Sequence, residues 1–294
     1  MAHNINFNER TGRYSFFSVK EKAWHGLGQI VEQYPTSGEA IKHAGLDYEV
    51  VKSPLFTKGS GIIETTKGIE IGSSELAVPN YFANIRTDNN AVLGVVGKDY
   101  HIVQNREAFN FFDAIVGGGE GILYETAGAL GNGERIFITA KLPDYIRVGR
   151  TDCIEKYLFL TSSHDGFGSI TASFTPVRVC CQNTLNASLR SMSNVVRIRH
   201  TSNAKDRLEQ AHKVMGISDM LSTQMENIFN HWTKIRITDN EVKKLIQSAL
   251  VPSKEVLKTI QDGKEEELST CFTNMVDSAF EYAMSNPTQL MDTT

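Results

Sequence analysis

The spacing of apolar residues changes near residue 200, and this change constrains the fold more than any other feature of the chain. Between residues 46 and 200, apolar and polar residues alternate in short segments that are separated by turn-forming residues. Such alternation is typical of half-buried β-strands. Beyond Ser202, apolar residues recur every three or four positions, as in an amphipathic helix. The order predicts an α+β fold in which antiparallel β-hairpins with packed helices precede a helical C-terminal third.

Pairs of alternating segments around turn residues predict successive hairpins. The pairs are 81–86 with 91–96, 122–127 with 135–140, and 157–161 with 169–174. Further strands are predicted at 46–50 and 195–200, and residues 57–75 predict either a hairpin or a flexible excursion. The first 60 residues look irregular, with signals for the strand at 46–50 and for a short helix that Ser37 could cap and Gly45 would end.

Helices are expected where apolar residues share one face. Asn105 is a good N-cap for a helix that Gly117 ends, and 181–189 predicts a shorter helix. Further helices are predicted over 208–215, 221–232, 239–250 and 265–284. We therefore divide the chain into a mixed core, 1–200, and a helical region, 201–294. The pattern leaves open whether the two form one domain.

Composition indicates a soluble globular protein. Of the 294 residues, 40% are hydrophobic and 22% charged, and no apolar run approaches the length that a membrane helix needs. The polar N-terminal segment carries acidic residues and does not resemble a secretory signal, so we expect a cytoplasmic protein that makes no membrane contact. The four cysteines show no C-x-x-C spacing, which predicts reduced thiols and no zinc site.

Positive charge is concentrated in the middle of a chain whose formal net charge is −4. Residues 135–213 hold 12 Lys and Arg against 6 Asp and Glu, whereas both flanking regions are acidic. From 178 to 207, six basic residues accompany one acid. This pattern predicts one surface that faces an anion. The predicted binding residues are Arg178, Arg190, Arg197, Arg199, Lys205 and Arg207.

Such a cluster could follow a phosphate backbone. Arg197 and Arg199 are two apart, so both project from one face of a strand. Three nearby aromatic residues could stack on bases: Tyr157, Phe167 and Phe174. The alternative is that these arginines pair with acidic residues of the C-terminal helices, within one subunit or between two.

Two histidine motifs have both a chemical and a structural interpretation. In Trp24–Gly28, His25 is either a general base or a hydrogen-bonded residue of a tight glycine turn, and we favour the turn. In His164-Asp165-Gly166, a metal or hydrolase site competes with a hairpin turn, which we also favour. We find no P-loop and no G-x-S-x-G motif. The sequence therefore predicts no catalytic residue, metal or cofactor, and it leaves enzymatic activity undecided, with a non-enzyme favoured.

Several segments resemble a known family. They are AWHGLG (23–28), VGKDYHIVQNREAFNFFD (96–113), GERIFITAKLP (133–143), VRVCCQNTLNASL (177–189) and IRHTSNAKDRL (198–208). They are similar to phage/plasmid-like proteins of a bacterial domain of unknown function. The resemblance implies a bacterial host cell and genes near those of replication and recombination, with no established activity. It also implies that the natural chain continues beyond the Thr-rich element 292–294.

These observations lead to three hypotheses. The first is a non-enzymatic protein that binds or anneals single-stranded DNA in phage or plasmid DNA metabolism, as a homo-oligomer with a basic groove. The second is a metal-dependent nuclease that uses scattered acidic residues and His25. The third is a phage structural, assembly or host-interaction protein. The local positive charge favours the first.

Overall fold

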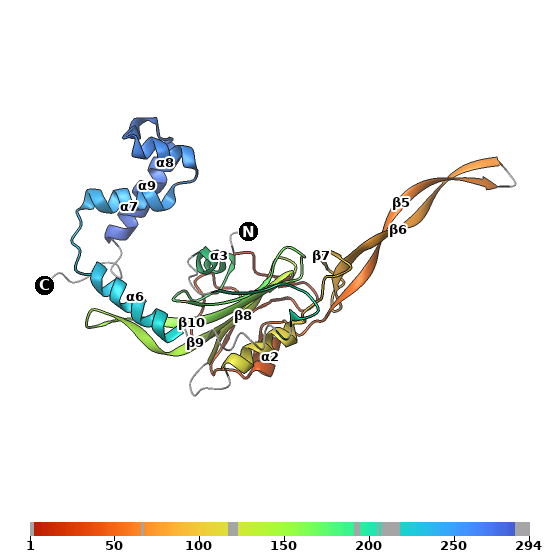
Figure 1. Cartoon of the computed structure of the whole chain (residues 1–294), viewed down its shortest axis with the longest axis horizontal. Coiled ribbons are helices and arrows are strands. Elements are labelled where there is room, and N and C mark those ends of the chain that lie inside the picture. The colour runs from red at the N-terminus through yellow and green to blue at the C-terminus, as the bar shows by residue number, and fades with distance from the viewer. Residues whose placement is uncertain are drawn as a thin grey trace. The chain divides into compact units, whose positions relative to one another are not determined.

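The computed structural model describes residues 3–65, 68–116, 123–190, 195–204, 206 and 218–285. In these residues the chain has the predicted α+β fold (Figure 1). It divides into two compact units, Met1–Phe229 and Asn230–Thr294.

A seven-stranded sheet forms the centre of the first unit. Its strand order is β12-β11-β10-β9-β8-β3-β4. Neighbours run antiparallel except β3 and β4, which are parallel. The strands are β3 (Phe16–Val19), β4 (Gln29–Val31), β8 (Leu123–Leu130), β9 (Arg135–Val148), β10 (Asp152–Ser163), β11 (Ile170–Thr175) and β12 (Val195–Ile198). The predicted hairpins of 122–140 and 157–174 are therefore confirmed.

A second sheet has three strands in the order β5-β6-β7. These are β5 (Val50–Thr65), β6 (Gly68–Arg86) and β7 (Val92–Gly97). Strand β7 pairs only with Tyr81–Ile85 of β6, so the rest of β5 and β6 forms a two-stranded ribbon (Figure 1). A bulge lies where the ribbon begins, with Asn80 at φ 65° and Pro79 beside it. Proline lacks a backbone N–H, and bulges are among the few places in a sheet that accept it.

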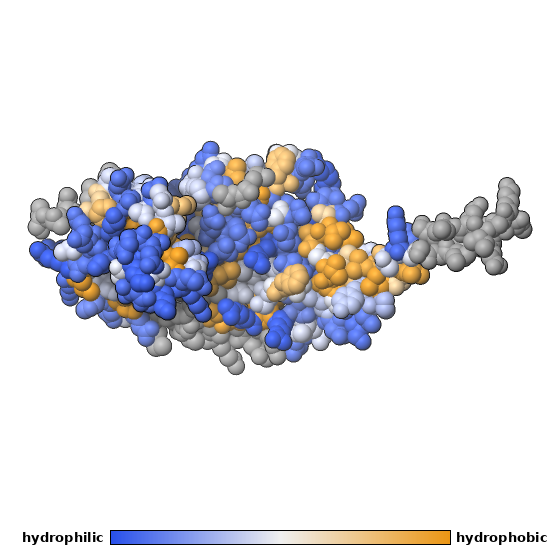
Figure 2. Space-filling model, turned by 90° about the horizontal axis from the view of Figure 1, so that it is seen from above, coloured by the Kyte–Doolittle hydropathy of each residue, from blue (hydrophilic) through white to orange (hydrophobic). Residues whose placement is uncertain are grey.

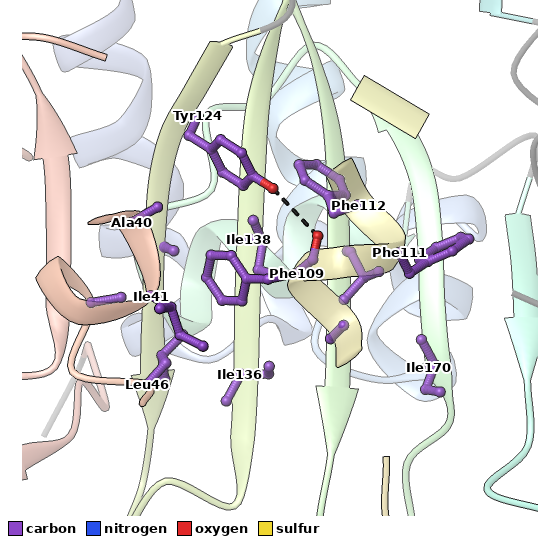
Figure 3. Packing of buried hydrophobic residues seen from close by; sticks show 14 of the residues in the cluster. Ala40, Ile41, Leu46, Phe109, Phe111, Phe112, Tyr124, Ile136, Ile138 and Ile170 are labelled. Carbon is purple, nitrogen blue, oxygen red and sulfur yellow. Dashed lines mark hydrogen bonds between the residues drawn. The ribbon is translucent and has the colours of Figure 1, made fainter. Parts of the chain in front are cut away.

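Both faces of the seven-stranded sheet are covered by helices or chain segments. Helices α1 (Ser37–His43) and α2 (Asn105–Val116) lie on one face, where Phe109 and Phe112 pack beside Tyr124 and Ile138 (Figure 3). Helix α3 (Gln182–Arg190) covers the other face, where Leu185 joins a separate core with Phe137 and Phe159. Figure 1 shows α2 and α3 on opposite sides of β8–β10. The alternation along β9 and β10 divides their apolar side chains between these two cores.

The remaining elements are small strands and C-terminal helices. Strands β1 (Phe7–Asn8) and β2 (Arg13–Tyr14) form a separate hairpin. The helices are α6 (Ser218–Trp232), α7 (Asp239–Leu250), α8 (Lys254–Gln261) and α9 (Thr270–Ser285), with the 3₁₀ turn η1 (Glu265–Glu267). The Thr238 side chain caps α7 by accepting from the backbone N–H of Glu241. The predicted helix at 208–215 lies outside the described residues.

The structure differs from expectation at two places near the sheet. The irregular N-terminal region supplies β3 and β4 to the central sheet, because strands of four and three residues are too short to show alternation. The strand predicted at 46–50 begins only at Val50. Leu46 is fully buried but lies outside any strand.

Asn105 begins α2 as predicted but does not cap it. Its Nδ2 donates to the backbone oxygen of Leu46 at 3.0 Å, and its Oδ1 lies 2.9 Å from Nε2 of His164. The Glu107 carboxylate instead accepts from the backbone N–H of Gln104 at 2.9 Å. The Asn105 side chain thus links three segments of the first unit.

Candidate nucleic-acid interface

A cavity of about 650 Å³ lies beside the end of β12. Its lining comes from three parts of the chain that are distant in sequence: the segment around Tyr100, the β10–β11 turn around Phe167, and the β12 end with Arg197, Arg199 and His200. We refer to Arg197, Arg199 and Phe167, with the cavity between them, as the candidate interface.

Arg197 lies on the edge strand β12, and Arg199 follows directly after the end of that strand. Arg197 pairs with Thr171 of β11, and the pairing register stops at Ile198, so the predicted shared direction of the two arginines stays a prediction. Both side chains are exposed. None of the ion pairs found in the described part of the chain involves either guanidinium. The described lining holds one carboxylate, that of Asp99. The two guanidinium groups and the Asp99 carboxylate therefore give the described lining a net positive charge.

The β10–β11 turn keeps the Phe167 side chain exposed to solvent. The Asp165 carboxylate accepts from the backbone N–H groups of Phe167 at 2.8 Å and Gly168 at 3.1 Å, and Gly166 takes a φ of 85°. Burial raises the pKa of Asp165, but hydrogen bonds from the turn and the nearby Arg135 charge outweigh it, so the net shift is downward. The turn packs on β7, where a Cβ added to Gly94 would lie 2.5 Å from the backbone oxygen of Asp165. Phe167 remains 94% exposed.

Tyr100 and His200 form a stacked pair at the cavity wall, with ring centroids 4.8 Å apart. The Tyr100 hydroxyl donates to the backbone oxygen of Ser163 at 2.8 Å. Nδ1 of His200 lies 3.2 Å from the backbone oxygen of His101, and since a carbonyl oxygen only accepts, Nδ1 carries the proton. Burial lowers the pKa of His200. The wall is therefore uncharged at neutral pH, and the positive charge of the cavity comes from the arginines.

Lys52 lies close to the Tyr100 ring of the cavity wall. Lys52 on β5 places Nζ 5.5 Å from the Phe82 ring centroid and 6.0 Å from that of Tyr100. The same ammonium donates to the backbone oxygen of Lys98 at 2.9 Å. Sequence analysis missed Lys52, Tyr100 and His200 as site residues. Lys52 and Tyr100 precede the basic segment by 126 and 78 residues, so no local spacing could have connected them with it.

His164 lies at the start of the β10–β11 turn, and its hydrogen bonds fix the turn to neighbouring segments. It is fully buried, and burial lowers its pKa to about 3. Asn105 Nδ2 donates to Leu46, which leaves Asn105 Oδ1 to accept from Nε2 of His164. Asn84 Nδ2 donates to the His164 backbone oxygen at 2.7 Å. This neutral, hydrogen-bonded ring confirms the interpretation of His164-Asp165-Gly166 as a turn between two strands.

The structure corrects the assignment of Arg178. Its Nη2 lies 2.7 Å from Oε1 of Glu125, its Nη1 lies 3.9 Å from Glu21, and Nη2 also donates to the backbone oxygen of Val19 at 3.1 Å. This guanidinium is neutralised by carboxylates, so we remove it from the predicted binding surface. The pairing could not be foreseen, because Glu125 lies 53 residues earlier, on β8, whereas Arg178 lies between β11 and α3.

The other predicted side chains have different outcomes. Arg190 is exposed at the end of α3 and does not line the cavity. Lys205 and Arg207 lie outside the described residues. Tyr157 is buried and donates its hydroxyl to Glu155, and Phe174 packs against the core on the α2 face. Of the three predicted stacking residues, Phe167 is exposed, Phe174 is partly buried and Tyr157 is buried.

His25 has a structural role. Its Nε2 lies 2.9 Å from the backbone oxygen of Cys180, and its Nδ1 accepts from the backbone N–H of Leu27 at 3.0 Å. Both ring nitrogens are thus occupied, and burial lowers the pKa of the ring. Gly26 and Gly28, at φ 72° and 81°, form the predicted tight turn. The Trp24 side chain remains 65% exposed beside His3.

Comparison with protein-family models shows which family the chain belongs to. A family model described as Domain of unknown function (DUF932) matches residues 92–293. No curated protein and no solved structure matches the chain. In the described part of the chain, no three His, Cys, Asp or Glu side chains are grouped to hold a metal ion. No described helix is long and apolar enough to cross a membrane.

Proposed function

Because the chain belongs to the family described as Domain of unknown function (DUF932), whose description names no activity, we propose its function from the candidate interface: binding of single-stranded nucleic acid without catalysis. The observation that supports this proposal is the pair of exposed guanidinium groups beside an aromatic ring that is 94% exposed. Cationic groups and stacking platforms are the two parts that single-strand binding requires.

The arginines neutralise phosphates in this proposal. Two residues along a strand span about 6.6 Å, which is comparable with the separation of neighbouring phosphates in an extended single strand. Each guanidinium offers planar, charge-assisted hydrogen bonds to phosphate oxygens. Such contacts release counterions, so affinity falls steeply as salt rises.

Phe167 favours a single strand over a duplex. A phenylalanine ring stacks on the face of an unpaired base, and that face is covered in a duplex by neighbouring base pairs. The Tyr100–His200 pair adds an aromatic, uncharged wall next to it. The site therefore combines backbone contacts with stacking that does not depend on base identity.

The proposed setting is phage or plasmid DNA metabolism in the bacterial cytoplasm. The resemblance to phage/plasmid-like proteins supports this setting, and binding or annealing of strands by a homo-oligomer would fit it. Addition of Mg²⁺ or Mn²⁺ to protein and oligonucleotide tests the competing nuclease hypothesis. Cleavage that depends on the metal would overturn the non-enzymatic proposal.

The change Phe167→Ala tests the stacking contact. We expect affinity for a labelled single-stranded oligonucleotide to fall about 5- to 150-fold, because stacking contributes about 1–3 kcal/mol per base. The melting temperature should stay the same, since an exposed side chain contributes little to folding. Fluorescence anisotropy and thermal unfolding measure the two quantities.

Phe7→Ala is the matched control for this change. Phe7 is 47% exposed on β1 and does not line the cavity. It should leave the affinity unchanged. Equal losses in the two variants would mean that Phe167 does not stack on the nucleic acid.

A further inference from the structure

An exposed carboxylate lies in the lining of the candidate interface. Asp99 lines the cavity together with Arg197 and Arg199. None of the ion pairs found in the described residues involves this carboxylate, and the hydrogen bond between Asp99 and the His101 ring uses the backbone oxygen of Asp99. A carboxylate repels the phosphates of a bound strand, which lowers affinity. Its place in the cavity therefore calls for a ligand group that donates hydrogen bonds to it.

The turn that carries Asp99 is fixed from two sides. The backbone N–H of the last residue of the turn 97–100 donates to the oxygen of the first at 3.2 Å, and the Lys52 ammonium donates to two backbone oxygens of this turn at 2.9 and 3.3 Å. Directly after the turn, the backbone N–H of His101 donates to the backbone oxygen of His200 at 3.0 Å. The carboxylate is thus held beside the end of β12, and little ordering is needed when a ligand binds.

An apolar surface adjoins the aromatic side of the cavity. The turn that carries Phe167 packs on β7, where a Cβ added to Gly166 would lie 3.1 Å from the backbone oxygen of Val95. Val95 is itself 51% exposed, and Figure 2 shows apolar residues gathered where the β5–β6 ribbon joins the rest of the first unit. Bases, rather than phosphates, fit such surroundings. An unpaired base would therefore bind on this side and the phosphates at the arginines.

Stacking on Phe167 does not distinguish one base from another, but hydrogen bonds to Asp99 do. The Watson–Crick edge of guanine presents two adjacent donors, N1–H and the N2 amino group, and a carboxylate accepts from both at once. Adenine and cytosine place a ring nitrogen acceptor beside their amino group, and thymine and uracil place two carbonyl oxygens around one N–H. A carboxylate repels each of these acceptors. Guanine is the base that it fits.

We propose that Asp99 makes the candidate interface select an unpaired guanine, which stacks on Phe167 while Arg197 and Arg199 bind the neighbouring phosphates. This selection rests on the function proposed above, because it assigns a specificity to the same site. The cavity of about 650 Å³ has room for a nucleobase. In a duplex the same edge of guanine is paired with cytosine, so the selection also requires a single strand.

Single-stranded oligonucleotides of about 15 nucleotides test this selection. Every third position of a thymidine strand carries guanine, adenine, cytosine or inosine, and fluorescence anisotropy measures each affinity. The wild type should bind the guanine strand about 5- to 150-fold more tightly than the adenine or cytosine strand. Inosine keeps N1–H but lacks the N2 amino group, so its strand should have an intermediate affinity.

Asp99→Asn keeps the shape of the side chain but changes its hydrogen-bonding groups. The amide presents one acceptor and one donor, which match adenine and cytosine and mismatch the two donors of guanine. The guanine preference should disappear, and the affinities for the adenine and cytosine strands should rise. A structural defect would instead lower all affinities together. Asp99→Ala removes both acceptors and should also abolish the preference.

Asp152→Asn is the matched control, because Asp152 is exposed on β10 and does not line the cavity. It removes the same charge and should keep the guanine preference. Equal melting temperatures of the three variants and the wild type would show that each variant folds.

The outcomes separate this selection from the function on which it rests. If the wild type binds no single strand, the proposed function fails and the guanine selection fails with it. If the wild type binds all the strands equally, or if Asp99→Asn and Asp99→Ala retain the guanine preference, the selection alone is overturned.

Discussion

Replacing both Arg197 and Arg199 with alanine is expected to weaken single-strand binding about 30- to 1000-fold at low salt. Each guanidinium that contacts a phosphate contributes about 1–2 kcal/mol. Both side chains are exposed, Arg197 on β12 and Arg199 directly after it. The slope of log affinity against log salt should also fall by about 1.4, because each phosphate contact contributes about 0.7 for a single strand. Anisotropy titrations of a labelled oligonucleotide at several salt concentrations give both quantities.

The double variant Arg106→Ala/Arg150→Ala separates local contact from net charge. Arg106 and Arg150 are exposed arginines that do not line the cavity, so this variant loses the same charge elsewhere. It should keep nearly all of the affinity and the full salt slope. Replacing Arg197 and Arg199 with lysine keeps the charge but loses the planar fork, and should give intermediate affinity. An unchanged slope in the alanine variant would mean that phosphates bind elsewhere.

The fold was predictable where the local pattern and the tertiary contacts agree. Strands β8 to β11 alternate and are joined by glycine-rich or Asp-Gly turns, so their pairing follows from near neighbours in sequence. Strand β3 pairs with β8, more than a hundred residues away, and β4 pairs with β3; the few residues of these two strands show no readable period. Asn105 lies at the predicted start of the helix, but its side chain does not cap the helix. It forms hydrogen bonds with Leu46 and His164 instead, which the local sequence could not predict.

The candidate site was predictable in part for the same reason. The shared direction of Arg197 and Arg199 depends on the two-residue period of a single strand, which the sequence contains. Whether a guanidinium is free depends on carboxylates brought by other strands, as Glu125 shows for Arg178. The cavity wall joins Tyr100 to His200 through contacts across about a hundred residues. The periodicity of one segment does not indicate which distant segments it contacts in the fold.

Arg178→Ala is expected to lower the free energy of unfolding by about 3 kcal/mol at neutral pH. Glu125 is 6% exposed and lies at a β-bulge between Tyr124 and Thr126, where β8 and β9 shift register. Removal of the arginine leaves this carboxylate buried without its cation, and it also removes the bond from Nη2 to the backbone oxygen of Val19. Urea denaturation with a constant m-value measures the loss.

The pH dependence of this loss identifies its cause. Burial raises the pKa of Glu125, and the Arg178 charge opposes that rise, so the pKa should climb further in the variant. A carboxyl whose folded pKa exceeds its unfolded value favours the folded state at low pH, and this contribution is lost as pH rises through the folded pKa. The deficit of Arg178→Ala should therefore shrink on acidification, when Glu125 takes up a proton.

Adding Glu125→Gln to the Arg178→Ala variant should restore most of the lost free energy of unfolding. The remaining deficit should no longer depend on pH, because the Glu125 carboxylate is gone. A deficit that persists in the double variant would instead assign the loss to packing of the arginine stem and to its bond with Val19. Oligonucleotide affinity should be the same in both variants and the wild type, since Arg178 lies outside the candidate interface. A selective loss of binding in Arg178→Ala would return this guanidinium to the nucleic-acid surface.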